Sequence, residues 1–201
     1  MEEGAPGWWI GFCVMDKPSK RIDLKRDFNL GDFRLTNFVH LGVEKERVRR
    51  WRNDEAVRKW MYSDHLISKR EHQRFIEGLR RDRKNFYWRV ENGEGETIGV
   101  ISLNKVDFEN KNAYLGVYAN PDFEGRGAGS GLIGSLKRLS FEVANLHTLR
   151  LEVIDGNERA LRFYRKAGFK REGRLKEFIF KEGRWKDVIV MGMIHKKGAA
   201  P

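Results

Sequence analysis

Glycine recurs at five positions in the stretch 119–134, ANPDFEGRGAGSGLIG, just before a helical pattern. The glycines occupy 125, 127, 129, 131 and 134, and apolar residues follow at helical spacing: Leu132, Leu136, Leu139 and Val143. A helix N-terminus leaves several N–H groups without partners and carries partial positive charge. Because glycine has no side chain, an anion can approach this backbone closely. The stretch therefore predicts a phosphate-binding turn at the start of a helix.

Two other phosphate-binding motifs fit this stretch less well. A P-loop requires Gly-Lys-Ser or Gly-Lys-Thr, and neither follows these glycines. Residues 129–134, GSGLIG, do match the dinucleotide-binding pattern G-x-G-x-x-G. In such a unit the strand runs almost directly into the first glycine, whereas residues 120–124 intervene here. A dinucleotide site is therefore disfavoured, and a glycine turn that binds no ligand stays open as an alternative.

The elements around this turn are predicted from periodicity, caps and turn residues. Ser68 and Glu71 form a capping box, Asn157 is suited as an N-cap, and 92–95 (NGEG) predicts a hairpin turn. The pattern predicts one or two helices over 43–61 and further helices over 68–79, 132–143 and 157–166. It predicts strands over 86–90, 98–106, 114–119, 148–154, 169–180 and 185–193. This order indicates one mixed α/β domain over 29–195, with an N-terminal extension of 1–28 and a tail of 196–201. The extension fits a disordered arm or a dimer contact.

The charge of the chain favours an anionic partner or ligand. Its 201 residues carry a formal net charge of +11, and 34% of them are charged. A nucleotide, a nucleic acid or an anionic membrane fits this charge, and so does a surface on which Lys and Arg are simply solvated. The basic run 80–84 is short and is interrupted by Asp82, which argues against nucleic-acid binding.

Cysteine and histidine usage indicates a cytoplasmic protein without a metal. Cys13 is the single cysteine, so the chain cannot form an internal disulfide. The five histidines show no metal-ligand spacing. The apolar segment 8–15 is much shorter than the roughly 20 residues that span a bilayer. We therefore expect a cytoplasmic protein that binds neither a metal nor a membrane.

The glycine turn resembles the pyrophosphate loop of the GNAT superfamily of N-acetyltransferases, Gln/Arg-x-x-Gly-x-Gly/Ala. Residues 124–129 read EGRGAG, so Glu124 replaces the usual Gln or Arg, and Arg126 is placed to compensate. Residues 157–169, NERALRFYRKAGF, resemble a second superfamily motif, N-x-x-A-x-x-x-Y-x-x-x-G-F. The resemblance implies the GNAT fold, a twisted and mostly antiparallel sheet flanked by helices, and acetyl-CoA as cofactor. The implied cofactor contacts are Val117, Tyr118, Glu124, Gly125, Arg126, Gly127, Ala128, Gly129, Ser130, Asn157, Tyr164 and Lys166.

Acetyl transfer from a thioester needs a neutral amine, a polarised carbonyl and a proton for the departing thiolate. The resemblance implies that Tyr164 is the general acid toward the sulfur of CoA, and a core tyrosine is the alternative. It also implies that a backbone N–H within 115–118 polarises the carbonyl, where the strand is splayed from its neighbour. Glu152 alternates with apolar neighbours and faces away from them, so it is a candidate base. A salt bridge between Glu152 and Arg150 fits the same pattern.

The N-terminal half carries the signal for the acceptor. The segments 51–53 (WRN), 60–63 (WMYS) and 112–118 (NAYLGVY) resemble the UDP-4-amino-4,6-dideoxy-N-acetyl-β-L-altrosamine N-acetyltransferases of pseudaminic acid biosynthesis. This resemblance covers about residues 48–193 and implies a small-molecule substrate, an amino sugar linked to a nucleotide. It is also compatible with a homodimer.

The same resemblance assigns residues to the acceptor. It implies substrate contacts at Arg52, His72, Asn104, Lys105 and Tyr118, and it places Ser102 close to the reacting groups. Arg52 and Lys105 are suited to a diphosphate. The apolar residues Trp60, Met61 and Tyr62 are candidates for a pocket around the 6-methyl group of the sugar, with plain helix packing as the alternative.

Two other functions stay open at this point. A ribosomal-protein N-terminal acetyltransferase shares the superfamily and the early tryptophans, and it needs an open or acidic groove to which Glu44 and Glu46 can belong. A nucleic-acid-binding module is the third reading, which rests on the net charge of +11 alone.

Overall fold

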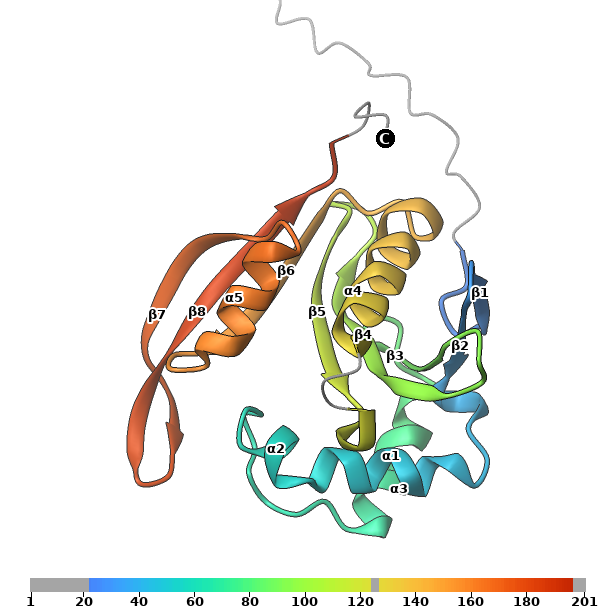
Figure 1. Ribbon diagram of the computed structural model, residues 1–201, viewed down its shortest axis with the longest axis horizontal. Helices are drawn as coiled ribbons and strands as arrows, with labels where there is room; N and C mark the ends of the chain where they lie inside the picture. Colours follow the sequence, from blue (N-terminus) through green and yellow to red (C-terminus); the bar gives the residue numbers. More distant parts are fainter. Residues whose placement is uncertain (1–21, 124–126, 197–201) are drawn as a thin grey trace, which may run out of the picture.

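Eight strands form one sheet in the order β1-β2-β3-β4-β5-β6-β8-β7, in which β5 and β6 are parallel and the other neighbours antiparallel (Figure 1). The computed structural model describes residues 22–123 and 127–196. The strands are β1 (Phe28–Leu30), β2 (Phe33–Asn37), β3 (Phe86–Glu91), β4 (Thr97–Asp107), β5 (Asn112–Ala119), β6 (Thr148–Ile154), β7 (Lys170–Lys181) and β8 (Arg184–Ile194). The α-helices are α1 (Glu44–Asn53), α2 (Glu55–Arg58), α3 (Lys69–Leu79), α4 (Ala128–Arg138) and α5 (Glu158–Lys166).

The predicted mixed sheet and its local signals are confirmed. Ser68 accepts from the N–H of Glu71, whose carboxylate accepts from the N–H of Ser68, so the capping box of α3 is complete. The side chain of Asn157 caps α5 by accepting from the N–H of Ala160. The segment 43–61, predicted as one or two helices, forms two, α1 and α2, because Asp54 ends the first helix and caps the second. The strands β5 and β6 with α4 between them form the one parallel crossover among the described strands, so the sheet lacks the successive parallel βαβ units of a dinucleotide-binding fold.

The domain begins earlier than the sequence predicted. Leu24 is only 1% exposed and belongs to the core cluster. Its carbonyl accepts from the side-chain amide of Asn37 at 3.1 Å, and the carbonyl of Arg26 accepts from the indole N–H of Trp88 at 3.0 Å. The boundary expected after residue 28 is therefore wrong for residues 22–28, which are part of the domain. Residues 1–21 and 197–201 lie outside the described residues.

Helices cover both faces of the sheet near its centre. On β4, Ile101 belongs to the cluster that contains Leu132 and Leu136 of α4, whereas Val100 packs in the cluster of α1 and α3. Successive residues of a strand point to opposite faces, so the strand is buried between the two groups of helices. Figure 1 shows α1, α2 and α3 gathered at one end of β5, with α4 and α5 alongside the strands.

The parallel pairing of β5 and β6 is short. It joins Asn112 to Thr148, Ala113 to Leu149 and Tyr114 to Arg150, and it stops there. β6 stays paired with β8 as far as Ile154, while β5 stays paired with β4 as far as Ala119. The two strands therefore diverge after Tyr114, as Figure 1 shows, and open a wedge in the sheet. This is the splay that was predicted for residues 115–118.

The glycines at the start of α4 have different structural roles. Gly127 is the N-cap with φ of 76°, a left-handed conformation that other residues adopt at a cost. An added Cβ at Gly131 would lie 2.8 Å from the ring of Phe33 and 3.1 Å from Ile98, so this glycine lets α4 approach the sheet. An added Cβ at Gly134 would meet nothing within 4 Å. The glycine-rich sequence thus serves helix packing as well as the turn.

These contacts predict opposite effects for two alanine substitutions in one helix. Gly134→Ala should raise the free energy of unfolding by about 0.5–1 kcal/mol, because alanine is the better helix former and the site has room. Gly131→Ala should lower it by about 1–3 kcal/mol, because the added methyl group overpacks the contact with β2 and β4. Urea unfolding of both variants and wild type measures the difference. Equal stabilisation by both substitutions would contradict the packing role of Gly131.

Candidate active site

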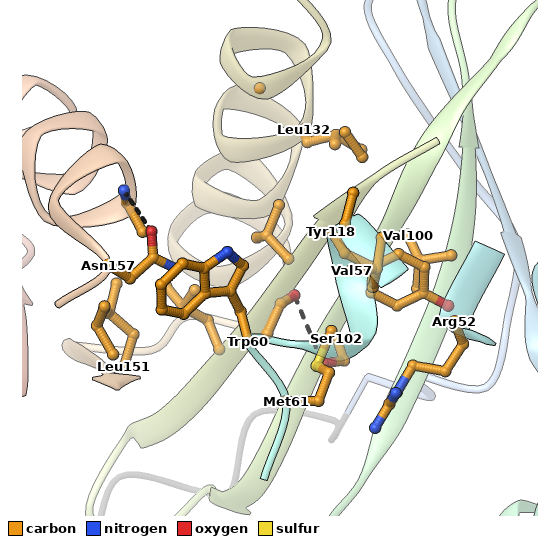
Figure 2. A pocket seen from close by; sticks show the side chains of 18 of the residues that line it. Arg52, Val57, Trp60, Met61, Val100, Ser102, Tyr118, Leu132, Leu151 and Asn157 are labelled. Atoms are coloured by element: carbon orange, nitrogen blue, oxygen red, sulfur yellow. Dashed lines mark hydrogen bonds between the residues drawn. The ribbon is translucent and has the colours of Figure 1, made fainter. Parts of the chain in front are cut away.

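The wedge between β5 and β6 continues into a cavity of about 1450 Å³. A single small-molecule site typically occupies roughly 300–1,000 Å³, so this cavity has room for two substrates side by side. Figure 2 shows Asn157 at one end, Arg52 at the other, and Ser102 and Met61 between them. Predicted site residues that line it are Arg52, His72, Ser102, Asn104, Lys105, Val117, Tyr118, Gly127, Ala128, Gly129, Ser130, Glu152, Asn157 and Tyr164.

The end at Asn157 has the features of a phosphate site. At the start of α4 the N–H of Ser130 donates to the carbonyl of Gly127 at 3.0 Å, whereas the N–H groups of Ala128 and Gly129 precede the hydrogen bonds of the helix. An added Cβ at Gly127 would meet nothing within 4 Å, so an anion can approach this turn. An added Cβ at Gly129 would lie 3.0 Å from the ring of Phe163, so this glycine lets α4 and α5 flank the wedge closely. The Oδ1 of Asn157 caps α5. The residues present therefore fit the pyrophosphate and pantetheine of CoA.

Two parts of the predicted cofactor site are not found at this end. Glu124, Gly125 and Arg126 lie outside the described residues, so their expected contacts stay predictions. Lys166 is exposed in the last turn of α5 and is not among the residues that line the cavity. Its cofactor contact therefore stays a prediction.

Tyr164 combines the two roles that the sequence left open. Its ring packs against Phe163, with centroids 5.2 Å apart, and against Phe169 at 5.8 Å. The residue also lines the cavity, and its hydroxyl has no hydrogen-bond partner within the described residues. Burial raises the pKa of Tyr164 to about 12. The hydroxyl therefore stays protonated at neutral pH, as a proton donor must.

Glu152 faces the cavity from β6, between the buried Leu151 and Val153. The alternative salt bridge to Arg150 is not formed, because Arg150 pairs with Glu172 at 2.7 Å. Instead Glu152 accepts a hydrogen bond of 2.5 Å from the hydroxyl of Tyr62. Burial and this carboxylate raise the pKa of Tyr62 well above its usual value. The contact joins the loop after α2 to β6 across the wedge.

Arg52 lies at the opposite end, on α1. Its Nη2 donates to the carbonyl and the hydroxyl of Ser63, both at 3.2 Å. Its Nη1 is buried without a hydrogen-bond partner within the described residues. Burial lowers the pKa of the guanidinium, and the charge of Arg52 partly offsets the rise that burial causes in the pKa of Tyr118. A cationic donor is thus left without an acceptor at the wall of the cavity.

Ser102 lies on β4 between Gly116 of β5 and Asn104. Asn104 donates to the hydroxyl of Ser102 at 3.0 Å, and an added Cβ at Gly116 would lie 2.6 Å from that oxygen. The glycine is therefore required for the hydroxyl to sit against β5. Lys105 follows in the bulge of β4, with φ of 51° and its Nζ 5.1 Å from the ring of Tyr114.

His72 is 6% exposed and stacks on Phe75 with ring centroids 6.4 Å apart. Burial, followed by the charge of Arg49, lowers the pKa of His72 to about 4. The imidazole is therefore neutral at physiological pH, and it can bind a ligand by hydrogen bonding but not by charge. Its burial also shows that His72 is not an exposed residue of the helix surface.

Comparison with known proteins identifies the family. Residues 45–169 match the profile of the Acetyltransferase (GNAT) family. The chain belongs to this family. It is similar to the acetyltransferase PseH of Campylobacter jejuni, with 32% identity over 148 residues that cover 73% of this chain and 90% of that protein. It is also similar to the spermidine N(1)-acetyltransferase of Vibrio cholerae, with 32% identity over 54% of this chain and 62% of that protein.

The solved structures agree on the fold. Spermidine N-acetyltransferase from Vibrio cholerae in complex with CoA and spermine superposes with a TM-score of 0.74 at 23% identity, over 82% of this chain and 96% of that chain. The protein is thus an acetyl-CoA-dependent N-acetyltransferase with the GNAT fold. In the described part of the chain, no helix has the length and apolarity that crossing a membrane requires.

The position of Tyr164 predicts how its hydroxyl affects the rate. Tyr164→Phe should lower kcat by about 10²-fold or more, because proton transfer to the leaving thiolate is lost, while KM for acetyl-CoA changes little. In wild type, kcat should show no loss from ionisation of Tyr164 as pH rises to about 10, because a raised pKa keeps the donor form. Steady-state kinetics with both substrates varied measures both effects. Parallel losses in kcat and in acetyl-CoA affinity would make Tyr164 a binding residue.

Proposed function

We propose that the acceptor is the 4-amino group of a UDP-linked 4-amino-4,6-dideoxy sugar, as in pseudaminic acid biosynthesis. The observation that carries this proposal is Arg52, whose buried Nη1 lies at the acceptor end without a partner within the described residues. The oxygens of a diphosphate can accept hydrogen bonds from such a guanidinium, since Arg binds phosphate oxygens in pairs. The similarity to PseH over 90% of that protein supports the same acceptor class.

The charges that line the cavity favour an anionic acceptor over a polyamine. The lining residues include the cations Arg52, Lys59 and Lys105 and the carboxylates Glu71 and Glu152. Both carboxylates already accept hydrogen bonds, Glu71 from the N–H of Ser68 and Glu152 from the hydroxyl of Tyr62. A polyamine carries several positive charges, and it would meet repulsion from these cations. A spermidine acceptor is therefore supported by the shared fold and by the 32% identity over 54% of this chain, and not by the charges of the cavity.

The ribosomal-protein reading is not supported by the acidic residues that suggested it. Glu46 pairs with Arg49 at 2.7 Å, and the Oε2 of Glu44 accepts from the N–H of Gly42 at 3.1 Å. Neither residue lines the cavity. The acidic groove that a basic peptide needs is therefore not formed by Glu44 and Glu46.

The site residues support direct transfer in a ternary complex. Acetyl-CoA supplies the acetyl group as a thioester. Glu152 takes a proton from the sugar ammonium, directly or through water, and the neutral nitrogen then forms the amide bond as the C–S bond breaks. The attacking nitrogen loses a second proton to solvent as the amide forms. Tyr164 gives its proton to the departing sulfur and regains one from solvent, and Glu152 releases its proton to solvent. The backbone of β5 beyond Tyr114 offers N–H groups that are not paired with β6 to polarise the carbonyl.

The acceptor class is tested by release of CoA thiol from acetyl-CoA with a panel of amines. We expect rapid release with the UDP-linked 4-amino sugar, slower release with the free sugar, and little with spermidine or a peptide N-terminus. Release of thiol with spermidine alone, or with peptides alone, would contradict the proposed acceptor. It would not contradict the assignment of the acetyl-CoA site.

Arg52 allows a sharper test on the same panel. Arg52→Gln should raise KM for the UDP-sugar by about tenfold or more, because a charge-assisted contact with the diphosphate is lost, while KM for acetyl-CoA stays nearly constant. Arg50→Gln is the matched control, since Arg50 is on the same helix with a side chain that is 74% exposed. An unchanged KM for the UDP-sugar in Arg52→Gln would remove this residue from the acceptor site.

The proposed base is tested by Glu152→Gln, which keeps an oxygen that can accept from Tyr62. The substitution should lower kcat at neutral pH by about 10²-fold, because no carboxylate is left to take the proton of the amine. The loss should shrink as pH rises, since more of the amine is then neutral on binding. Glu158→Gln, which removes another carboxylate at the cavity, serves as the control. A full rate for Glu152→Gln at every pH would exclude Glu152 as the base.

A further inference from the structure

Lys181 is a buried cation whose partners lie far away in the chain. It is at the end of β7 and is only 3% exposed. Its Nζ donates to the carbonyl of Met61 at 2.7 Å and to the carbonyl of Arg58 at 3.3 Å. Burial lowers the pKa of Lys181, which reflects the cost of removing an ammonium group from water. Charge-assisted hydrogen bonds to carbonyl oxygens offset this cost.

The two carbonyls belong to the end of α2 and to the turn that follows it. α2 ends at Arg58, whose carbonyl also accepts from the N–H of Met61 at 3.0 Å, so Lys181 adds a second, charged donor to it. At the carbonyl of Met61 the same ammonium group makes its shorter contact. Lys181 therefore binds the turn at both of its ends and holds residues 58–61 in place from outside the helical region.

The held turn leads directly to the wall of the cavity. Trp60, Met61 and Tyr62 all line it, and Figure 2 shows Trp60 and Met61 projecting inward. The hydroxyl of Tyr62 binds Glu152, and its ring packs on Phe178 of β7 with centroids 6.2 Å apart. β7 thus contacts this wall twice, through Lys181 at the backbone and through Phe178 at the side chain.

The later part of the loop after α2, residues 63–67, is held by α1. Asn53 of α1 exchanges two hydrogen bonds with the backbone of Ile67, at 2.8 and 2.9 Å. Arg52 binds Ser63 from the same helix. These contacts hold residues 63–67, whereas the contacts of Lys181 and Phe178 from the C-terminal hairpin hold the segment 58–62, together with Glu152 of β6.

We infer that Lys181 is a positioning residue for the acceptor half of the active site. It holds residues 58–62 so that Trp60, Met61 and Tyr62 form the wall opposite β6, with Tyr62 on the carboxylate of Glu152. The inference rests on the proposed use of this wall by the acceptor. It makes the C-terminal hairpin, which contributes neither Glu152 nor Tyr164, part of the machinery that places the amine.

The test uses Lys181→Met in the full chain, because methionine keeps most of the stem and removes the ammonium group. KM for the UDP-sugar should rise about tenfold, with KM for acetyl-CoA nearly unchanged, as expected for loss of a charge-assisted contact on one side of the site. Lys181→Arg should recover part of the loss, because it keeps charge and donors. Lys176→Met, at an exposed position of the same strand, is the matched control. A rise of both KM values by the same factor would indicate a general structural role and overturn the inference.

A second readout separates this inference from the acceptor assignment. Amide hydrogen exchange of residues 58–62 needs no acceptor, and it should become faster in Lys181→Met than in wild type or Lys176→Met. If wild type does not turn over the UDP-sugar but exchange behaves as expected, the acceptor assignment fails and the positioning of the wall stands. Unchanged exchange in a folded variant would overturn the inference. Should Lys181→Met fail to fold, Lys181→Gln, which keeps one donor, is measured by the same two criteria.

Discussion

The divergence of β5 from β6 after Tyr114 is the constraint on which the rest of the structure depends. Once the parallel pairing stops, the edge of β5 that faces β6 carries backbone groups without a strand partner, and such groups require partners from elsewhere. A ligand laid into the wedge can provide them. The sheet tolerates this opening because each half is completed separately, β5 by β4 on one side and β6 by β8 on the other. The active site is therefore a gap in the main-chain hydrogen bonding of the sheet, lined by side chains.

Contacts must hold the two sides of such a gap together, and the described residues form three that differ in chemistry. At the cofactor end, Gly129 of α4 lies against the ring of Phe163 of α5, a contact that a side chain at 129 would disturb. At the acceptor end, Tyr62 binds Glu152, and Lys181 holds the turn before Tyr62. The first contact is apolar. The other two are polar, and one of them uses the carboxylate of Glu152, which is also the proposed base. Binding of the acceptor and the contact with Tyr62 therefore use the same carboxylate oxygens.

Local signals were readable from the sequence, and contacts between distant residues were not. The cap at Asn157 and the capping box at Ser68 involve neighbours within three residues, so both were predicted correctly. The contacts of Tyr62 with Glu152 and of Lys181 with Met61 join residues 90 and 120 positions apart, and no periodicity encodes them. The strands β1 and β2 were missed because they are short, at three and five residues, and follow a basic stretch that resembles a tail. The glycine run was explained by phosphate binding, and the packing role of Gly131 was missed, because residue type alone does not show what a Cβ would meet.

The unpartnered Nη1 of Arg52 is the physical basis of the proposed anionic acceptor. A buried donor that lacks a hydrogen-bond acceptor costs about 1–3 kcal/mol, and more if the group is charged. Nη2 of Arg52 binds the loop at Ser63, and Nη1 has no partner within the described residues. An anionic acceptor recovers this cost on binding and gains the attraction of the guanidinium. A polycationic acceptor does not recover this free energy and is repelled by the guanidinium, so Arg52 would weaken its binding. Since the rest of α1 is well packed, with Val48 and Trp51 in the core, a ligand with negative charge accounts for Arg52 more simply than an error of packing.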